Sequence, residues 1–247
     1  MQFKNTLEYA RELDAEDKLS SYRDQFIFPQ HQGENVIYFT GNSLGLQPKS
    51  AKKYVDEIMT DWANLAVEGH FYAEKPWWDY HERFSAKLAK VVGAKPAEVT
   101  VMNTLTVNLH LLMVSFYRPK GKRYKIICEE KAFPSDQYMI SSQVRFHGYD
   151  PNDAIVEIKR REGENNFRTE DILAKIKEVG EECALVLIGG VNYYTGQVLE
   201  METITRAGHE IGAFVGWDLA HAAGNIELNL SEWNVDFAAW CSYKYMN

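Results

Sequence analysis

An aspartate and a lysine in the last part of the sequence each follow a short apolar run. Asp218 comes directly after Ala213–Trp217, and Lys244 follows Phe237–Trp240 and three small or aromatic residues. A carboxylate at the end of a strand points into the crevice at the edge of a sheet. A lysine in apolar surroundings is partly desolvated, which lowers its pKa and makes its amine a usable nucleophile. Two simpler interpretations stay open: Asp218 as the cap of a following helix, and Lys244 as a lysine that reaches solvent.

Together these two side chains suit pyridoxal phosphate (PLP). The stretch between Asp218 and Lys244 is long enough for one crossover between strands, so both can open into one crevice. In enzymes that use this cofactor, a lysine forms the Schiff base and a carboxylate holds the pyridinium nitrogen protonated. The pair therefore favours a PLP-dependent enzyme.

Two further segments offer what the phosphate and the ring of this cofactor need. Thr104–Asn108 precedes an apolar helical run, and backbone N–H groups at a helix N-terminus bind phosphate well. Within Ala132–Asp136, Phe133 can stack on an aromatic ring and Asp136 can accept a hydrogen bond from it. Each segment alone also fits a plainer interpretation, a Thr or Asn helix cap and a proline turn.

Motifs of several other chemistries are missing from the sequence. It has no Walker-type phosphate loop and no GxGxxG after a strand, which disfavours a nucleotide-binding protein. Its seven histidines form no HExxH or HxH pattern, which argues against a catalytic metal.

The elements that must position these residues alternate between strands and helices. Short apolar runs predict strands at Tyr124–Cys128, Ala154–Ile158, Ala184–Ile188, Ala213–Trp217 and Phe237–Trp240. Helical spacing predicts helices over Ser50–Val67, Trp78–Val92, Leu105–Phe116, Thr169–Gly180 and Met201–Ile211. Thr169, with two acids after it, looks like a capped helix start, and Leu105–Phe116 is apolar almost all round, as in a buried helix. This alternation predicts an α/β fold with a mainly parallel sheet flanked by helices.

The composition is that of an ordinary globular protein. The 247 residues are 45% hydrophobic and 25% charged, with a net charge of −8, which rules out wholesale disorder and disfavours general nucleic-acid binding. No apolar run approaches the ~18 residues that span a bilayer, and the charged N-terminus does not resemble a secretory signal. Cys128, Cys183 and Cys241 are far apart and form no CxxC, so we expect a reducing, cytoplasmic setting without disulfides or zinc.

Taken together, the motifs resemble those of the kynureninases, a family of fold type I PLP enzymes related to aspartate aminotransferase. The similarity runs from about Tyr38 to the last residue, in blocks that follow one another in the right order. These blocks are Tyr38–Pro48, Asn103–His110, Lys131–Asp136, Tyr193–Gln197, Trp217–His221 and Trp240–Tyr245. The aspartate and lysine are shared by the whole superfamily, whereas Ser-Tyr-Lys-Tyr and Phe-Pro-Ser-Asp narrow the resemblance to this family.

The resemblance implies a role for each matching residue. Lys244 matches the Schiff-base lysine, Asp218 the acid that faces the pyridine nitrogen, and Tyr243 a phosphate-contacting tyrosine that also serves in proton transfer. Ser43 and His70 match positions near the substrate. The other matches to cofactor contacts are Leu105, Thr106, Phe133, Pro134, Ser135, Asp136 and His221. One departure is Gly189, where the family often carries a serine or threonine that helps to hold the cofactor.

The resemblance also implies how the chain is organised. We expect an N-terminal helical segment and arm over residues 1–60 and a PLP-binding large domain of fold type I over residues 61–247. The chain stops shortly after Lys244, so this large domain is expected to be incomplete. The C-terminal small domain would be absent, together with the arginine that clamps the substrate carboxylate in the family.

The implied reaction is hydrolysis of the Cβ–Cγ bond of L-kynurenine or 3-hydroxykynurenine. The products are anthranilate or 3-hydroxyanthranilate and L-alanine, in tryptophan degradation and NAD biosynthesis. The family implies a homodimer, and nothing in the sequence indicates a metal, a nucleic acid or a membrane as partner. Three alternatives are an inactive or weakly PLP-binding fragment, another fold type I enzyme such as a cysteine desulfurase, and, least favoured, a nucleotide-binding α/β protein.

Overall fold

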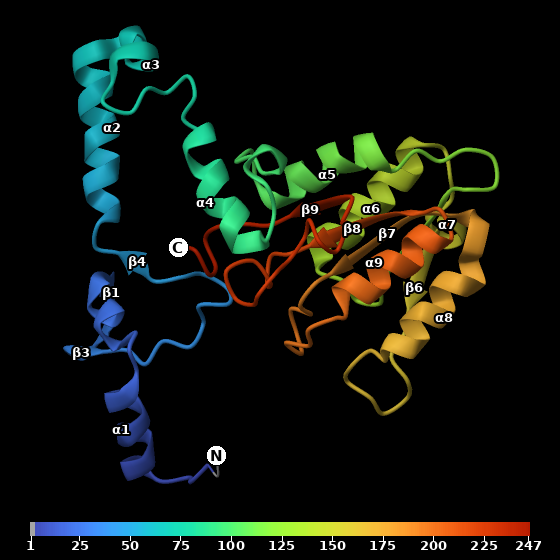
Figure 1. Cartoon of the computed structure of the whole chain (residues 1–247), viewed down its shortest axis with the longest axis horizontal. Coiled ribbons are helices and arrows are strands. Elements are labelled where there is room, and N and C mark those ends of the chain that lie inside the picture. The colour runs from blue at the N-terminus through green and yellow to red at the C-terminus, as the bar shows by residue number, and fades with distance from the viewer. Residues whose placement is uncertain (1–2) are drawn as a thin grey trace. The chain divides into compact units, whose positions relative to one another are not determined.

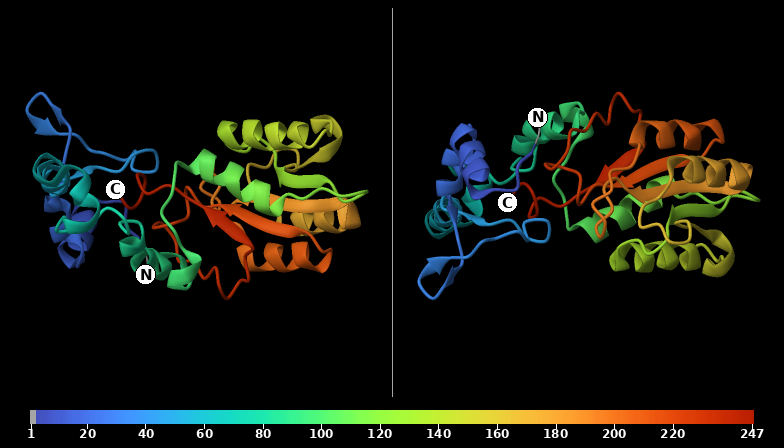
Figure 2. Two further views of the ribbon diagram at one scale, coloured as in Figure 1. Left: turned by 90° about the horizontal axis from the view of Figure 1, so that it is seen from above. Right: turned by 90° about the horizontal axis from the view of Figure 1, so that it is seen from below.

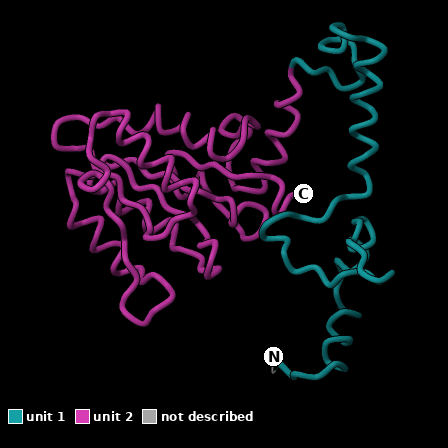
Figure 3. The backbone as a smooth tube through the Cα atoms, turned by 180° about the vertical axis from the view of Figure 1, so that it is seen from behind, with its two compact units in different colours: residues 1–78, 247 teal, residues 79–246 magenta. Residues whose placement is uncertain are grey.

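The computed structural model describes residues 3–247, which form two compact units (Figure 3). One unit comprises residues up to Trp78 together with Asn247, and the other is Asp79–Met246. The boundary expected at residue 60 lies inside the continuous helix α2 (Ala51–Leu65), so the structure divides the chain further along.

Five parallel strands form the sheet of the larger unit, in the order β6-β5-β7-β8-β9 (Figure 1). They are β5 (Lys125–Glu129), β6 (Ile155–Ile158), β7 (Cys183–Gly189), β8 (Phe214–Asp218) and β9 (Phe237–Ala239). Each strand agrees with a predicted run to within one residue at either end. The predicted parallel sheet flanked by helices is therefore confirmed. The strand order reverses between β5 and β7, and such reversals are where ligands bind in open α/β sheets.

Helices cover both faces of this sheet (Figure 2). On one face lie α5 (Leu105–Phe116) and α6 (Pro134–Phe146), and on the other α8 (Thr169–Val179) and α9 (Met201–Glu210). The remaining elements of this unit are α4 (Glu82–Val92), α7 (Pro151–Ala154), η3 (Pro96–Glu98) and η4 (Gly180–Glu182). The chain thus builds a three-layer α/β/α arrangement, in which every central strand is buried on two faces.

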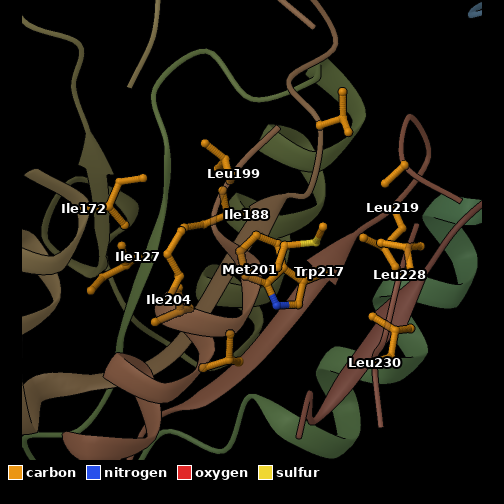
Figure 4. Close-up of a cluster of buried hydrophobic side chains, with 14 of the residues drawn as sticks. Ile127, Ile172, Ile188, Leu199, Met201, Ile204, Trp217, Leu219, Leu228 and Leu230 are labelled. Atoms are coloured by element: carbon orange, nitrogen blue, oxygen red, sulfur yellow. The ribbon is translucent and has the colours of Figure 1, made fainter. Parts of the chain in front are cut away.

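Two apolar clusters, one on each face, hold these layers together. The larger cluster packs α8 and α9 on the sheet around the fully buried Trp217 (Figure 4). The Nε1–H of Trp217 donates to Thr205 Oγ1 at 3.1 Å, so the indole is buried with its polar atom paired. The smaller cluster packs Leu109 and Met113 of α5 and the inner face of α6 on β5, β7 and β9.

Two helix predictions need correction. α5 is not buried all round: Leu109 and Met113 face the sheet, whereas Leu111 is 47% and Val114 60% exposed on the other side. Only one side of a helix can contact a flat sheet, and an all-apolar composition does not mark which side that is. Thr169 is the first residue of α8 and not its cap, because the N-cap is Arg168, which makes no side-chain capping bond.

The smaller unit consists of helices and two short strand pairs. Its helices are α1 (Leu7–Glu16), η1 (Ser20–Gln25), α2, η2 (Ala66–Glu68) and α3 (Gly69–Tyr72). β1 (Phe26–Ile27) pairs with β4 (Gln47–Pro48), and β2 (Gln30–His31) with β3 (Glu34–Asn35), both antiparallel. No helix of residues 3–247 is long and apolar enough to cross a membrane.

Candidate functional site

Several polar side chains gather at the carboxyl edge of the sheet. Asp218 ends β8 and is in register with Gly189, which ends β7, and with Ala239, which ends β9. Glu129 ends β5, the strand on the other side of β7. Because the strands are parallel, these ends meet along one edge, where the loops that follow them form the site.

The lysine predicted from the sequence reaches a histidine at this edge. Lys244 lies in the turn after β9, and its Nζ is 2.8 Å from Nε2 of His221. Burial and the charge of Lys244 lower the pKa of His221, against the opposing effect of Asp218. His221 is therefore neutral at pH 7, and its Nε2 accepts a hydrogen bond from the lysine amine.

Asp218 closes a turn and does not cap a helix. Its Oδ1 accepts the backbone N–H of Ala220 at 2.7 Å, and the residues that follow form consecutive turns. The interpretation of Asp218 as the cap of a following helix is therefore wrong, because turns follow it. The bond to Ala220 fixes the orientation of the carboxylate at the end of the strand.

A second carboxyl group, that of Asp136 in the first turn of α6, is buried where the charge of Asp218 acts on it. Asp136 is 8% exposed, and the hydroxyl of Ser135 donates to its Oδ1 at 3.3 Å. Burial, and then the neighbouring charges of Asp218 and Glu129, raise the pKa of Asp136 well above its ordinary value. Asp136 therefore keeps its proton at neutral pH.

Phe133 offers an aromatic face beside the lysine. Its ring is 44% exposed, and its centroid is 5.9 Å from Lys244 Nζ. The ring of Tyr193 meets it edge-on, at 5.2 Å between centroids and an angle of 90°. Pro134 follows as the first residue of α6, where its fixed φ suits a helix start.

The turn that carries Tyr193 is organised by a residue that none of the sequence motifs singles out. Asn192 is 3% exposed, and its Oδ1 accepts the N–H groups of Tyr194 and Thr195 and the hydroxyl of Thr195. This buried side chain thus accepts three of the hydrogen bonds that hold the turn. An asparagine shortly after a strand-like run and four residues before a glycine, Gly196, is the sequence signal that marks such a position.

The start of α5 lies toward the same edge of the sheet. At its other end, Phe116 stacks on Phe237, the first residue of β9, at 4.8 Å. The helix therefore runs antiparallel to the strands, with Leu105 and Thr106 in its first turn toward the carboxyl edge. Thr104, the N-cap, makes no side-chain capping bond, so the N–H groups of this turn keep their capacity to bind an anion.

Tyr243, next to the lysine, is 49% exposed. Hydrogen bonding to Cys241, followed by burial, raises the pKa of this phenol above its ordinary value. The hydroxyl therefore carries its proton throughout the neutral range.

Ser43 and His70 belong to the smaller unit, whereas all the other predicted site residues belong to the larger one. Both side chains are exposed. The His70 ring lies edge-on to Trp77 at 5.4 Å, and its backbone carbonyl accepts the N–H of Trp78. Within residues 3–247, no three His, Cys, Asp or Glu side chains are grouped as metal ligands.

The fold and this edge define an α/β protein that gathers an amine, an imidazole and paired carboxyls at the carboxyl ends of a parallel sheet. Residues 37–247 match the family model of the class-V aminotransferases. The chain belongs to this family.

The chain is also similar to curated relatives in sequence and to solved structures in fold. The chain is 85% identical to a kynureninase of Christiangramia forsetii, 57% to one of Myxococcus xanthus and 50% to one of Nematostella vectensis, over 97–100% of its length. It spans only 54–58% of the length of these curated relatives. The apo cysteine desulfurase of Thermococcus onnurineus has the same fold, with a TM-score of 0.64 at 19% identity, over 99% of this chain and 55% of that one.

Proposed function

We propose that the chain carries the PLP site of a kynurenine-hydrolysing enzyme. The observation that carries this proposal is the contact of Lys244 with His221, 2.8 Å apart beside Asp218 at the carboxyl edge of the sheet. The kynureninases that match along the whole chain supply the substrate class, a 2-amino acid with a γ-carbonyl.

The residues present fit this cofactor in kind and placement. The half-buried amine of Lys244 can bind its aldehyde, and an anion, Asp218, can hold a protonated pyridine nitrogen. Phe133 provides a face for the ring, and the uncapped start of α5 at Leu105 and Thr106 provides donors for the phosphate. The full set that would hold it is Leu105, Thr106, Phe133, Pro134, Ser135, Asp136, Asp218, His221, Tyr243 and Lys244. When bound, the cofactor supplies an electron sink for bonds at the α- and β-carbons of the substrate.

The chain's own residues then position groups and move protons. The neutral imidazole of His221 accepts a hydrogen bond from the amine of Lys244 and keeps it at the site. This amine would serve as the base that removes the α-proton of the substrate. Tyr243 holds a proton for Cβ, the carbon that becomes the methyl group of L-alanine. In the net reaction, one water adds across the Cβ–Cγ bond of L-kynurenine, so that anthranilate and L-alanine account for every atom.

Three finer statements complete the proposal. Ser43 and His70 would contact the substrate, as the matching positions of the family do. The enzyme would act as a homodimer, on the same ground. A cytoplasmic setting is supported by the three cysteines, all free and buried.

The test is a visible absorption spectrum of the purified chain with added PLP, beside Lys244→Ala. We expect a band distinct from the free cofactor in the parent chain and none in the variant. Anthranilate fluorescence after addition of L-kynurenine then reports turnover. A chain without the band would contradict the cofactor site, and a chain with the band but without anthranilate would support a PLP-binding fragment that does not turn over.

A further inference from the structure

One of the sequence blocks, Tyr193–Gln197, supplies no residue to the proposed contacts with cofactor or substrate. It lies in the turn that follows β7. Its last residue, Gln197, is half-buried, and its side-chain amide forms hydrogen bonds outside the turn. The partners of this amide therefore show what the end of the block does.

The amide of Gln197 pairs with the backbone of a residue that lies 30 positions earlier in the chain. Its Oε1 accepts the N–H of Phe167 at 2.8 Å, and its Nε2 donates to the carbonyl of Phe167 at 2.7 Å. One side chain thus satisfies both backbone groups of Phe167, as a neighbouring β-strand would. Gln197 therefore joins the turn after β7 to the loop between β6 and α8.

The loop residue that Gln197 contacts is itself fixed to the larger unit. Phe167 is 5% exposed and belongs to the larger apolar cluster. The guanidinium carbon of Arg160 lies 4.3 Å from the centroid of its ring, a cation–π contact. The backbone N–H of Arg160 donates to Oε1 of Glu130, just after β5, at 2.7 Å. The amide of Gln197 thus binds to a well-anchored segment.

The turn has internal hydrogen bonds as well. Within residues 3–247, the other hydrogen bonds of residues 192–197 join these residues to one another. One of them, from the N–H of Asn192 to the backbone carbonyl of Gln197 at 2.8 Å, closes the turn. Tyr193 lies between these two residues, with its ring edge-on to Phe133. The internal bonds fix the shape of the turn, whereas the amide pair links it to the rest of the larger unit.

We propose that Gln197 is a positioning residue for the aromatic wall formed by Phe133 and Tyr193. By pairing with the backbone of Phe167, its amide holds Tyr193 in place against Phe133, at 5.2 Å between the ring centroids. A face that is already held in place loses little conformational freedom when a planar ligand binds to it. The use of this wall by the cofactor rests on the proposed PLP site, whereas the coupling of Gln197 to Tyr193 does not.

The test is the nuclear Overhauser effect between the rings of Tyr193 and Phe133 in the cofactor-free chain. The cross-peak is identified by its loss in Tyr193→Leu and in Phe133→Leu. Gln197→Met keeps the length of the side chain but has no amide, so we expect the cross-peak to be lost. The matched control is Phe167→Leu, which loses packing in the apolar cluster but keeps both backbone groups that Gln197 binds. This control should lower the melting temperature and keep the cross-peak.

A cross-peak that survives in Gln197→Met overturns the inference. Loss of the cross-peak in Phe167→Leu as well also overturns it, because the position of Tyr193 would then follow general stability and not the amide pair. If either variant does not fold, amide exchange of the parent chain in low urea decides. The N–H of Phe167 and the N–H of Asn192 are bonded to the two carbonyl oxygens of Gln197, so both should exchange through one common opening. Two separate openings would contradict the proposal.

PLP binding is measured separately, by absorbance. Gln197→Met should bind PLP about 2–10-fold more weakly than the parent chain, the effect of one lost hydrogen bond. Equal affinity would contradict the part of the inference that concerns the cofactor. A parent chain that shows the cross-peak but no cofactor band overturns the proposed function and leaves the coupling of Gln197 to Tyr193 standing.

Discussion

Lys244 Nζ and His221 Nε2 are 2.8 Å apart, although the two residues come from turns after different strands. The contact joins the turns that follow the paired strands β8 and β9, because each residue lies a few positions beyond its strand. Because the lowered pKa keeps the imidazole of His221 neutral, its Nε2 accepts a hydrogen bond from Lys244 and the ring carries its proton on Nδ1. The amine is thereby held in one place at the edge of the sheet, where a carbonyl group can approach it.

The first prediction concerns the pH dependence of stability. The pKa of His221 is lowered in the folded chain by burial and by Lys244, so below its ordinary pKa the unfolded state binds more protons than the folded state. The stability that depends on neutral His221 is therefore present above about pH 6.5 and is lost as the pH falls through the lowered pKa. In His221→Asn, the decrease in melting temperature between pH 7 and pH 5 should be smaller than in the parent chain.

The matched control for this prediction is His31→Asn, because His31 is an exposed histidine in the smaller unit. Its pH profile should follow that of the parent chain. If the melting temperatures of all three proteins depend on pH in the same way, protonation of His221 does not destabilise the folded chain, and the prediction is contradicted.

The second prediction separates the two tasks of Asp218. Asp218→Asn keeps an oxygen for the Ala220 N–H, which lies 2.7 Å from Oδ1, but removes the charge, whereas Asp218→Ala removes both. We expect both variants to bind PLP about 10–100-fold more weakly, since a hydrogen bond to a charged group contributes about 1.5–3 kcal/mol. Only Asp218→Ala should also lower the melting temperature. Equal PLP affinity of Asp218→Asn and the parent chain, measured by fluorescence titration, would contradict the role of the charge.

The sheet and the main site residues were predictable because both leave a local pattern. A parallel strand buried on two faces is a continuous apolar run, as in Cys183–Gly189, and such runs marked all five strands. A polar residue that follows such a run directly, as Asp218 does, or within a few positions, as Lys244 does, is expected at the carboxyl edge of the sheet.

What escaped prediction depends on contacts between distant parts of the chain. Glu129 ends a strand just as Asp218 does, but its burial and its bond to Gly189 come from the pairing of strands 60 residues apart. Hydrophobic periodicity carries no information about that pairing. The exposed side of α5 could not be predicted for a related reason. Leu109 and Leu111 are the same residue type, and only contact with the sheet makes Leu109 buried and leaves Leu111 exposed.

The third prediction tests the turn that supports Phe133. In Asn192→Ala, the acceptor of three hydrogen bonds is lost, and two backbone N–H groups of the turn lose their partner. We expect a destabilisation of about 1–3 kcal/mol and weaker PLP binding, because Tyr193 would no longer be held edge-on to Phe133. Thr195→Val removes only the hydroxyl and should have a smaller effect on both quantities. Urea unfolding measures the first, and an effect of Thr195→Val as large as that of Asn192→Ala would argue against this account of the turn.

The fourth prediction compares two glycines of the same backbone conformation. Gly93 ends α4 with φ of +61°, and Gly121 lies in a surface turn with φ of +58°. An alanine at either position would have to adopt left-handed backbone, which costs about 1–2 kcal/mol. At Gly93, however, the new Cβ would also lie 2.2 Å from the backbone oxygen of Leu228, whereas at Gly121 nothing lies within 4 Å.

The difference in stability between Gly93→Ala and Gly121→Ala therefore measures the cost of the contact between the new Cβ and the backbone of Leu228. The segment that contacts Gly93 is held by two backbone hydrogen bonds. The N–H of Ser231 donates to the carbonyl of Gly93, and the N–H of Leu230 donates to the carbonyl of Val92. It cannot move away without breaking these bonds, so Gly93→Ala should be less stable than Gly121→Ala by about 1–3 kcal/mol, as for other overpacked sites. Urea unfolding of both variants measures the gap. Equal stabilities of Gly93→Ala and Gly121→Ala would show that the segment at Leu228 can shift without cost. Gly93 would then be needed only for its backbone conformation.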